Sequence, residues 1–209
     1  TQGLSGFVRY LPTELVQALV ARGQEDRPQV REATILYLDL QGFTRIGEQL
    51  SPQALVELLN EFFSLVYAHI KSHGGAVLQF QGDAILAAFN VPNDCEEHRR
   101  QAVLCALAID AQLQTHQFSG EIKLAARIGL NSGNVIAGTV GSAERANYTI
   151  HGDAVNLAAR LEAMNKHHHS RILASANTVE GLKSTFTRTP LGDVEVRGKQ
   201  STVTIYRLA

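Results

Sequence analysis

The 209-residue sequence has no tryptophan, one methionine and two cysteines, and its charges nearly cancel. Cys95 and Cys105 alone do not make a disulfide framework, which favours a reducing compartment, and Cys105 is expected to be a buried free thiol because it lies in an apolar helical run. A net charge of -1 gives no bulk attraction for nucleic acid or anionic lipid, so any binding of phosphate must be local. We therefore expect no nucleic-acid partner.

Long apolar runs and a secretory signal are also missing. No run approaches the roughly 20 residues that a membrane helix needs, and no charged and apolar leader opens the chain. We expect a cytoplasmic domain that inserts no segment into a membrane. Because the first residue is Thr1 rather than Met, we also expect an upstream regulatory domain in a longer parent protein, which leaves open that the parent is membrane-bound.

Apolar patterns predict one α+β domain behind an N-terminal segment. Residues 1–30 are expected to form a helix, Pro12–Arg22, and a charged connector, and residues 31–209 to form the domain. Strands alternate with helices there, and tight hairpins join several strands, which favours a mostly antiparallel sheet with helices on one face. The expected strands are 33–40, 76–81, 84–89, 124–130, 135–140, 171–174 and a pair around Gly198; the expected helices are 52–73, one capped by Asp94 with its apolar stripe at 102–113, 152–166 and 175–182.

The apolar run Ala33–Leu40 contains one carboxylate, Asp39. Because nearly every side chain is apolar, the run is predicted to be a buried strand. A carboxylate near the end of such a strand must be paired, hydrogen-bonded or bound to a metal. Gly42 permits a tight turn, so the amides of Gln41–Thr44 would point outwards at a helix start, which attracts phosphate. The alternative is that Asp39 only caps the following helix.

Asp83 occupies a second position of this kind, in the Gly82-Asp83 turn between two apolar strands. Hairpin topology could bring Asp39 and Asp83 to one edge of the sheet. Two converging carboxylates suit Mg²⁺, which completes its shell with water and substrate phosphates, and a pair of such ions suits phosphoryl displacement. The alternative is that Asp83 is only a turn residue.

Asn156 and Arg160 are four residues apart in the expected helix 152–166 and therefore share one face. The residues around them are apolar or small. An Arg beside an Asn on such a face suggests contacts to a phosphate and a sugar, because the planar guanidinium is permanently charged. The alternative is a surface Arg160 that pairs with Glu162 or Asp153.

Four segments, YLDLQGFT, FQGDAILAAF, RIGLNSGNVIAGTVGS and YTIHGDAVNLAARLE, closely resemble the catalytic domain of the class III nucleotidyl cyclases, which are adenylyl and guanylyl cyclases. Their order and separation across residues 30–208 are far more specific than any one of them. The resemblance implies a ferredoxin-like α+β domain, with a mostly antiparallel sheet and helices packed on it. It also implies a head-to-tail homodimer with active sites between the subunits.

The resemblance implies two divalent cations, Mg²⁺ or Mn²⁺, held by Asp39 and Asp83 with the Leu40 carbonyl also near a metal. The implied reaction is attack of the ribose 3′-oxygen on the α-phosphorus, which expels pyrophosphate and leaves a 3′,5′-cyclic nucleotide. Positioning and charge stabilisation would supply most of the rate. A water, Asp39 itself or a substrate phosphate could accept the proton.

Phosphate contacts are implied at three further places. The turn Gly42, Phe43 and Thr44 would meet the triphosphate, and Arg127 would contact its terminal phosphates. Arg197 falls where the family usually has a phosphate-binding Lys, which keeps the charge and changes the geometry.

Across the implied interface, Asn156 would orient the ribose and Arg160 would stabilise charge on the α-phosphate. Gln79 and Thr149 fall at the two purine positions, where adenylyl cyclases commonly have Lys with Asp or Thr, and guanylyl cyclases Glu and Cys. The pair is nearer to the adenylyl set, in particular to the bacterial and soluble-type branch with Thr, so ATP is the expected substrate. A Gln amide can donate or accept, which keeps GTP or dual specificity open.

Two other classes of function compete with a cyclase. A non-catalytic cyclase-like module that regulates through dimerisation would be expected to have lost an Asp, the Asn or the Arg, and this sequence has lost none of them. A polymerase-like palm that makes linear or cyclic dinucleotides would share the sheet and the two metals. It would not require Asn156 and Arg160 from a second subunit.

Overall fold

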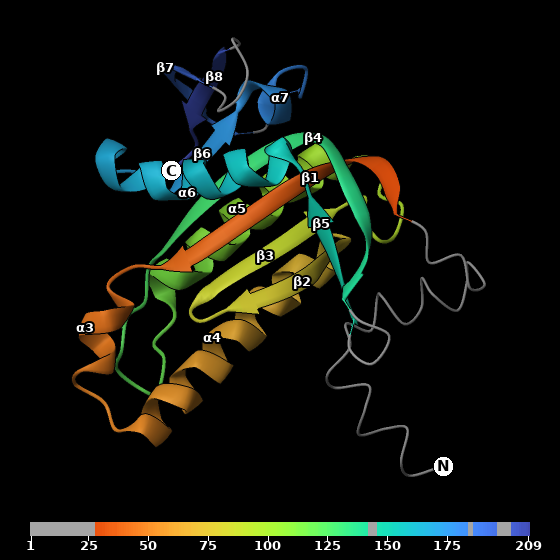
Figure 1. Cartoon of the computed structure of the whole chain (residues 1–209). Helices are drawn as coiled ribbons and strands as arrows, with labels where there is room; N and C mark the ends of the chain where they lie inside the picture. Colours follow the sequence, from red (N-terminus) through yellow and green to blue (C-terminus); the bar gives the residue numbers. More distant parts are fainter. Residues whose placement is uncertain (1–27, 142–145, 184–185, 196–201) are drawn as a thin grey trace.

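A computed structural model describes residues 28–141, 146–183, 186–195 and 202–209. The expected helix Pro12–Arg22, Arg197 and the turn at Gly198 lie outside the described residues. The elements of the described part (Figure 1) are β1 (Gln29–Leu40), α3 (Phe43–Gly47), α4 (Pro52–Ser72), β2 (Gly75–Gln81), β3 (Ala84–Phe89), α5 (His98–Thr115), β4 (Ala126–Gly141), β5 (Ala146–His151), α6 (Asp153–His168), β6 (Ile172–Ser175), α7 (Ala176–Val179), β7 (Thr189–Glu195) and β8 (Thr202–Arg207).

The strands form one sheet with the order β2-β3-β1-β4-β6-β8-β7, and β5 pairs with β4 beside this path. Neighbouring strands are antiparallel except for β4 and β6, which are parallel. The prediction of an α+β domain with a mostly antiparallel sheet is confirmed. In the part of the chain that the structure describes, no helix is both long enough and apolar enough to cross a membrane.

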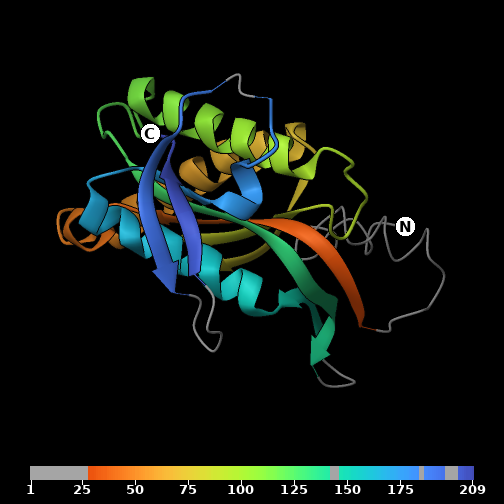
Figure 2. The same cartoon turned by 90° about the horizontal axis from the view of Figure 1, so that it is seen from above.

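Helices cover both faces of the sheet, so the prediction of helices on one face is wrong. Figure 2 shows α4 and α5 on one side of the sheet and α6 on the other. β1 explains the difference, because its side chains alternate between two cores: Leu36 and Leu38 pack with α4 and α5, and Ile35 packs in the cluster that includes Ala158 of α6. A strand that is apolar on both faces needs a cover on each.

β4 is one long strand, which contradicts the prediction of two strands around Asn131-Ser132-Gly133-Asn134. These four residues pair with β1 instead of turning. Their polar groups have partners in the fold: Asn131 donates to the Ala154 carbonyl and accepts from the Ser175 hydroxyl, and the Ser132 hydroxyl lies 2.7 Å from that of Thr34. Turn-forming composition was overridden because tertiary contacts satisfy these side chains within the sheet.

Two helix starts differ in how well they were predicted. Ser51 caps α4 as expected, because its hydroxyl accepts from the Ala54 amide at 3.2 Å. Asp94 does not cap α5, which begins only at His98; its carboxylate accepts instead from Arg31 on β1. Cys105 of α5 is a buried free thiol, as predicted.

Candidate active site

Two cross-strand rows of residues occupy the face of the sheet that α6 partly covers. Residues paired across strands lie on one face of a sheet, and every second residue returns to that face. The first, which we call the carboxylate row after Asp39, consists of Gln81, Ala84, Asp39 and Arg127. The second, which we call the amide row after Gln79, lies two residues away along each strand and consists of Gln79, Leu86, Tyr37 and Gly129.

A β-bulge in β2 brings Gln79 and Gln81 to this face. Val77 pairs with Ala87, but the register then shifts, and Gln79 pairs with Leu86. The extra residue reverses the direction of the side chains that follow it. Val77 therefore packs in the core of α4 and α5, while Leu86, the partner of Gln79, belongs to the core on the side of α6.

Asp39 and Asp83 lie beside each other. Asp39 pairs with Ala84, and Asp83 directly precedes Ala84 in a tight turn where Gly82 has a φ of 64°. Partial burial, and then the negative charge of Asp39, raise the pKa of the Asp83 carboxyl above its usual value. The carboxylates converge at one edge of the sheet; their role as metal ligands stays a prediction.

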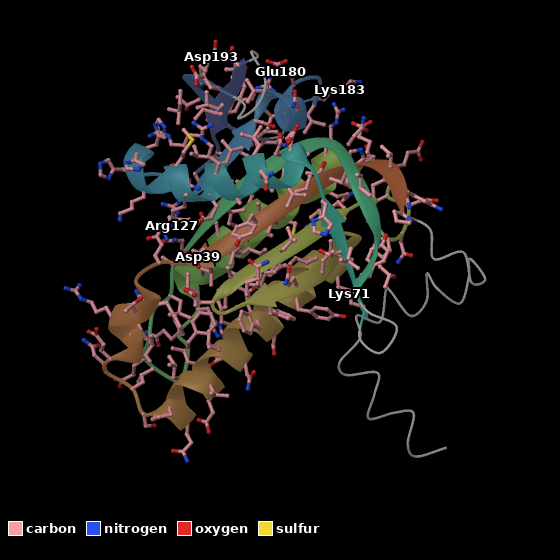
Figure 3. The ribbon with its side chains drawn as sticks, viewed as in Figure 1. Asp39, Lys71, Arg127, Glu180, Lys183 and Asp193 are labelled. Carbon is pink, nitrogen blue, oxygen red and sulfur yellow. The ribbon has the colours of Figure 1, made fainter. Side chains whose placement is uncertain are left out.

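Arg127 bridges two carboxylates. The register of β1 and β4 places it opposite the first of them, Asp39. Its Nη2 donates to Oδ2 of Asp39 at 3.1 Å, and its Nε donates to Oε1 of Glu162 at 3.0 Å. Figure 3 shows Asp39 and Arg127 side by side at the ends of β1 and β4. The predicted phosphate residue thus lies within the acidic cluster, with only two of its five N–H groups engaged by these carboxylates.

Glu162 is a site residue that the sequence analysis missed, since it was considered only as a partner for Arg160. It is 7% exposed, and burial, followed by the charge of Asp39, raises the pKa of its carboxyl. The available signal was position: Glu162 is four residues after Ala158 and directly follows Leu161, so it lies on the buried face of α6. A carboxylate on a buried stripe needs a partner.

The close approach of α6 to β4 depends on Gly129. A Cβ at this position would lie 2.1 Å from the Ala158 carbonyl oxygen and 2.4 Å from the Glu162 nitrogen. Any side chain at Gly129 would therefore push α6 outwards and move Glu162 away from Arg127.

The acidic cluster fits divalent cations. Among the described residues the three carboxylates of Asp39, Asp83 and Glu162 outnumber the guanidinium that faces them, which belongs to Arg127. Within the described ranges no group of three or more His, Cys, Asp or Glu residues could hold a metal ion without other ligands. Mg²⁺ commonly binds through one or two carboxylates and takes water and phosphate oxygens for the rest, so Asp39 and Asp83, with the adjacent Leu40 carbonyl, form a suitable donor set.

The turn after β1 has the predicted form. Gly42 adopts a left-handed conformation, with φ 70°, and precedes α3. The first helical hydrogen bond is donated by the Arg45 amide to the Gly42 carbonyl at 3.0 Å. The amides of Phe43 and Thr44 therefore belong to the first turn, whose N–H groups have no acceptor within a helix.

Asn156 and Arg160 lie on α6, but not in the cluster around Asp39. Both are exposed, and at about 100° per residue they occupy the side of α6 opposite Ala158, which packs on the sheet. Arg160 Nη1 donates to the Glu195 carbonyl oxygen at 2.6 Å, so the alternative in which it pairs with Glu162 is wrong. Within one chain, the two halves of the predicted site do not meet.

The two predicted purine residues lie on two strands that are in contact but are not paired with each other in the sheet. Gln79 is exposed on β2, and Thr149 is partly buried on β5, where it pairs with Gly138 of β4. β2 and β5 are in contact, and Leu78 and Tyr148 from these strands pack on the same apolar cluster. The structure therefore brings both purine positions of one chain to one region.

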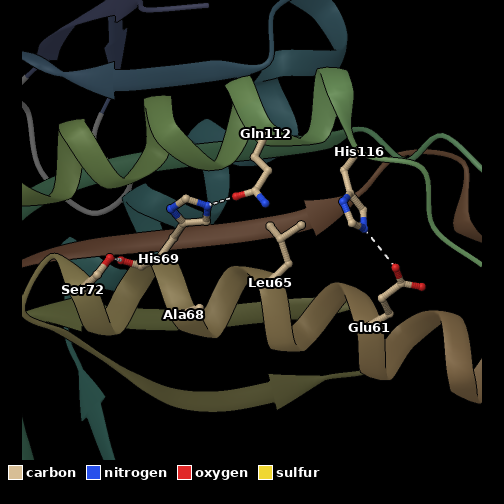
Figure 4. A pocket seen from close by; sticks show the side chains of 7 residues that line it. All are labelled: Glu61, Leu65, Ala68, His69, Ser72, Gln112 and His116. Carbon is tan, nitrogen blue, oxygen red and sulfur yellow. Dashed lines mark hydrogen bonds and ion pairs between the residues drawn. The ribbon is translucent and has the colours of Figure 1, made fainter.

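A groove between α4 and α5 is a separate feature (Figure 4), on the other side of the sheet from the two rows. Its volume is about 460 Å³, and two side-chain pairs, His116 with Glu61 and His69 with Gln112, lie along it. Its lining residues are Glu61, Leu65, Ala68, His69, Ser72, Gln112 and His116. None of the predicted site residues belongs to it.

Comparisons with known proteins show the family to which this chain belongs. The family described as "Adenylate and Guanylate cyclase catalytic domain" matches residues 25–209, and the chain belongs to this family, the class III nucleotidyl cyclase catalytic domains. Adenylate cyclase 1 of Rhizobium meliloti (strain 1021) is 34% identical in an alignment 208 positions long that covers 97% of this chain and 31% of that protein. The adenylate cyclase of Anabaena cylindrica is 31% identical over 98% of this chain and 43% of its own length.

Among solved structures, a bacterial light-regulated adenylyl cyclase is similar over the whole chain and 61% of its own, with a TM-score of 0.86 and 29% identity. The chain thus spans less than half the length of the two curated relatives and most of the solved structure.

Proposed function

We propose that this domain is an adenylyl cyclase, which converts ATP into 3′,5′-cyclic AMP and pyrophosphate at sites shared by two copies of the chain. The observation that best supports shared sites is that the predicted site residues fall into two separated halves. Asp39 and Asp83 converge beneath α6, whereas Asn156 and Arg160 are exposed on the opposite side of that helix. A second chain in head-to-tail arrangement would reunite the halves.

In this proposal Asp39, Asp83 and the Leu40 carbonyl hold two divalent cations, Mg²⁺ or Mn²⁺. When bound, such ions polarise the α-phosphate and stabilise the attacking and leaving oxygens. The chain's own cations complete the phosphate site: Arg127 keeps three N–H groups beyond its contacts with Asp39 and Glu162. Arg197 adds a further cation.

The turn after β1 would receive the triphosphate of the same nucleotide. The first-turn amides of Phe43 and Thr44, behind the left-handed Gly42, are donors of the kind that bind phosphate oxygens.

Asn156 and Arg160 of the second chain would orient the ribose and neutralise the charge that develops on the α-phosphate. Arg suits this role because its guanidinium is planar and always charged. Exposed apolar side chains that lie side by side support the homodimer: Ile136 on β4 is 50% exposed, and Val30, its cross-strand partner on β1, is 72% exposed. Apolar surface of this kind often marks a protein–protein interface.

ATP is favoured because two relatives that align with nearly the whole chain are named adenylate cyclases. Gln79 with Thr149 is also nearer to the purine pair of that group. The family includes guanylate cyclases, and a Gln amide has both donor and acceptor atoms, so a guanylyl or dual-specificity cyclase is the second candidate. A non-catalytic module is disfavoured, because no metal, ribose or α-phosphate residue is lost.

We further propose that the domain is the output domain of a longer cytoplasmic signalling protein with an upstream regulatory domain. The lengths of the relatives support this, because the chain spans only 31% and 43% of them.

Complementation between two inactive variants tests the shared site. Asp39→Ala and Arg160→Ala chains should each be inactive, and their co-expression should restore about a quarter of the wild-type rate, because half of the dimers would be mixed and each would hold one intact site of two. Cyclic AMP formed with Mg²⁺ and with Mn²⁺ is measured. Asp39→Ala with Asp83→Ala is the matched control, since both lesions fall in the same half and no site is restored. Equal failure of both pairs would contradict a shared site, and wild-type protein that forms no cyclic AMP would contradict the proposed activity.

A further inference from the structure

A short chain of hydrogen bonds ends at the predicted purine residue Gln79. The Tyr37 hydroxyl donates to Oε1 of Gln81 at 2.9 Å, and Nε2 of Gln81 donates to Oε1 of Gln79 at 2.7 Å. Neither Tyr37 nor Gln81 has a role in the catalytic scheme described above.

The fold places these three side chains together. Gln79 and Tyr37 both pair with Leu86 of the intervening strand, and the bulge after Val77 puts Gln81 on the same face as Gln79. Tyr37 is fixed in turn, because its ring packs in the apolar cluster that includes Leu86. A partly buried phenol therefore anchors a chain of two exposed amides.

The direction of the chain decides what Gln79 can offer to a base. A Gln amide has one oxygen that accepts and one nitrogen that carries two N–H donors. In the structure the oxygen of Gln81 accepts from the Tyr37 hydroxyl, and the nitrogen of Gln81 donates to the oxygen of Gln79. Gln79 is then left with its Nε2 donors for a ligand.

We propose that Tyr37 and Gln81 are positioning residues for nucleotide specificity, which hold the Gln79 amide as a hydrogen-bond donor and thereby select adenine over guanine. This inference rests on the proposed function of the same site. N1 of adenine is an acceptor and matches the donor, and the adenine amino group can donate to the Thr149 hydroxyl. Guanine has N1–H and an amino group on the corresponding edge, so two donors would face each other, and an unpaired donor in a closed site lowers affinity.

The first experiment removes the anchor alone. Tyr37→Phe keeps the ring and deletes the hydroxyl, so both amides can rotate and Gln79 can present either edge. The ratio of the dissociation constants of 3′-deoxy-GTP and 3′-deoxy-ATP, which lack the attacking hydroxyl, is measured with Mn²⁺ and should fall about tenfold. Tyr206→Phe is the matched control, because its hydroxyl donates to Glu180 from β8, and it should leave the ratio unchanged.

The second experiment reverses the direction of the hydrogen bond between Gln81 and Gln79. In Gln81→Glu the new carboxylate only accepts, so it would take hydrogen bonds from both the Tyr37 hydroxyl and Nε2 of Gln79. Oε1 of Gln79 would then face the base and could accept from guanine N1–H, and the preference should shift beyond that of Tyr37→Phe, towards GTP. Gln81→Met, of similar length without either polar atom, should fall between wild type and Gln81→Glu.

The two readouts separate this inference from the proposed function. Turnover of ATP and GTP by wild type tests the activity, whereas the affinity ratio of the unreactive analogues tests the chain of amides. A ratio that is the same in wild type, Tyr37→Phe and Gln81→Glu would overturn the inference even in an active cyclase, as would wild type that binds neither analogue. A ratio that shifts as expected supports the inference even where turnover is absent.

Discussion

The two faces of β1 near its C-terminal end carry different kinds of residue. Leu36, Leu38 and Leu40 point into the core under α4 and α5 and are at most 2% exposed. Tyr37 and Asp39 alternate with them on the other face, where the Asp39 side chain is 26% exposed. Near its C-terminal end the strand thus serves the fold with its leucines and the site with Tyr37 and Asp39, because the side-chain period of a strand is two.

The residues of the two faces also differ in what they contribute to stability. The leucine face gains stability from every buried side chain. The Asp39 face gathers the carboxylates of Asp83 and Glu162, whose pKa values burial and mutual repulsion raise. Arg127 relieves only part of that repulsion. Such a face is arranged for a ligand rather than for stability.

Neighbouring alanine substitutions should separate the two faces most sharply. Asp39→Ala is expected to lower kcat about a thousandfold, because a bound cation would lose a charged ligand, with little change in the free energy of unfolding. Leu38→Ala, one residue away, should cost about 3 kcal/mol of stability, because it leaves a cavity in a packed core. Cyclic AMP formation and urea unfolding measure both. A destabilisation by Asp39→Ala as large as that by Leu38→Ala would remove the distinction.

Gly129→Ala should damage both stability and the site through α6. The added methyl would meet the Ala158 carbonyl at 2.1 Å, so α6 must shift, at a cost of about 3 kcal/mol. The shift would also move Glu162 from Arg127, so activity should fall further than stability alone explains. Gly47→Ala is the control, because its Cβ would meet only a Leu55 methyl at an ordinary 3.5 Å. Equal unfolding midpoints for the two variants would contradict this account of the contact.

Most of the fold could be predicted because periodicity reports burial. The run Ala33–Leu40 indicated a strand buried on both faces, and Ser51 followed by helical spacing indicated α4, and both are present. The continuous strand through Asn131 and Ser132 could not be predicted, because partners from α6, β1 and β6 satisfy their side chains. Local composition holds no information on contacts that distant segments supply.

The same limit of prediction from sequence applies to the candidate site. Asp39 and Asp83 could be identified because each is a lone carboxylate in an apolar context, with a glycine within three residues, and the structure places them together. The contact of Arg127 with Glu162 required the register of β4 and the crossing of α6. The position of Gln81 beside Gln79 and Tyr37 required a bulge that leaves no mark in the composition.

Asp83→Asn should produce the smallest effect and the most direct test of the repulsion. The pKa of Asp83 is raised, so the folded state holds its proton more tightly than the unfolded chain. That contribution to stability is present below the unfolded pKa, near 3.9, and is lost as the pH rises through the folded pKa. At pH 7 the ionised side chain therefore destabilises the metal-free fold.

Removal of that charge should raise the stability of the metal-free protein at pH 7 by about 0.5 kcal/mol, because solvent screens a side chain this exposed, and Tm by about 1–2 °C. The gain should vanish below about pH 4, where Asp83 is protonated in both states, which separates the charge from any preference of Asn for the turn. Mn²⁺ should raise the Tm of wild type more than that of Asp83→Asn, because the variant has lost a charged ligand. Calorimetry at the two pH values, with and without Mn²⁺, measures all of these shifts. If Asp83→Asn were less stable than wild type at pH 7 and its Tm responded equally to Mn²⁺, Asp83 would have only the role of a turn residue.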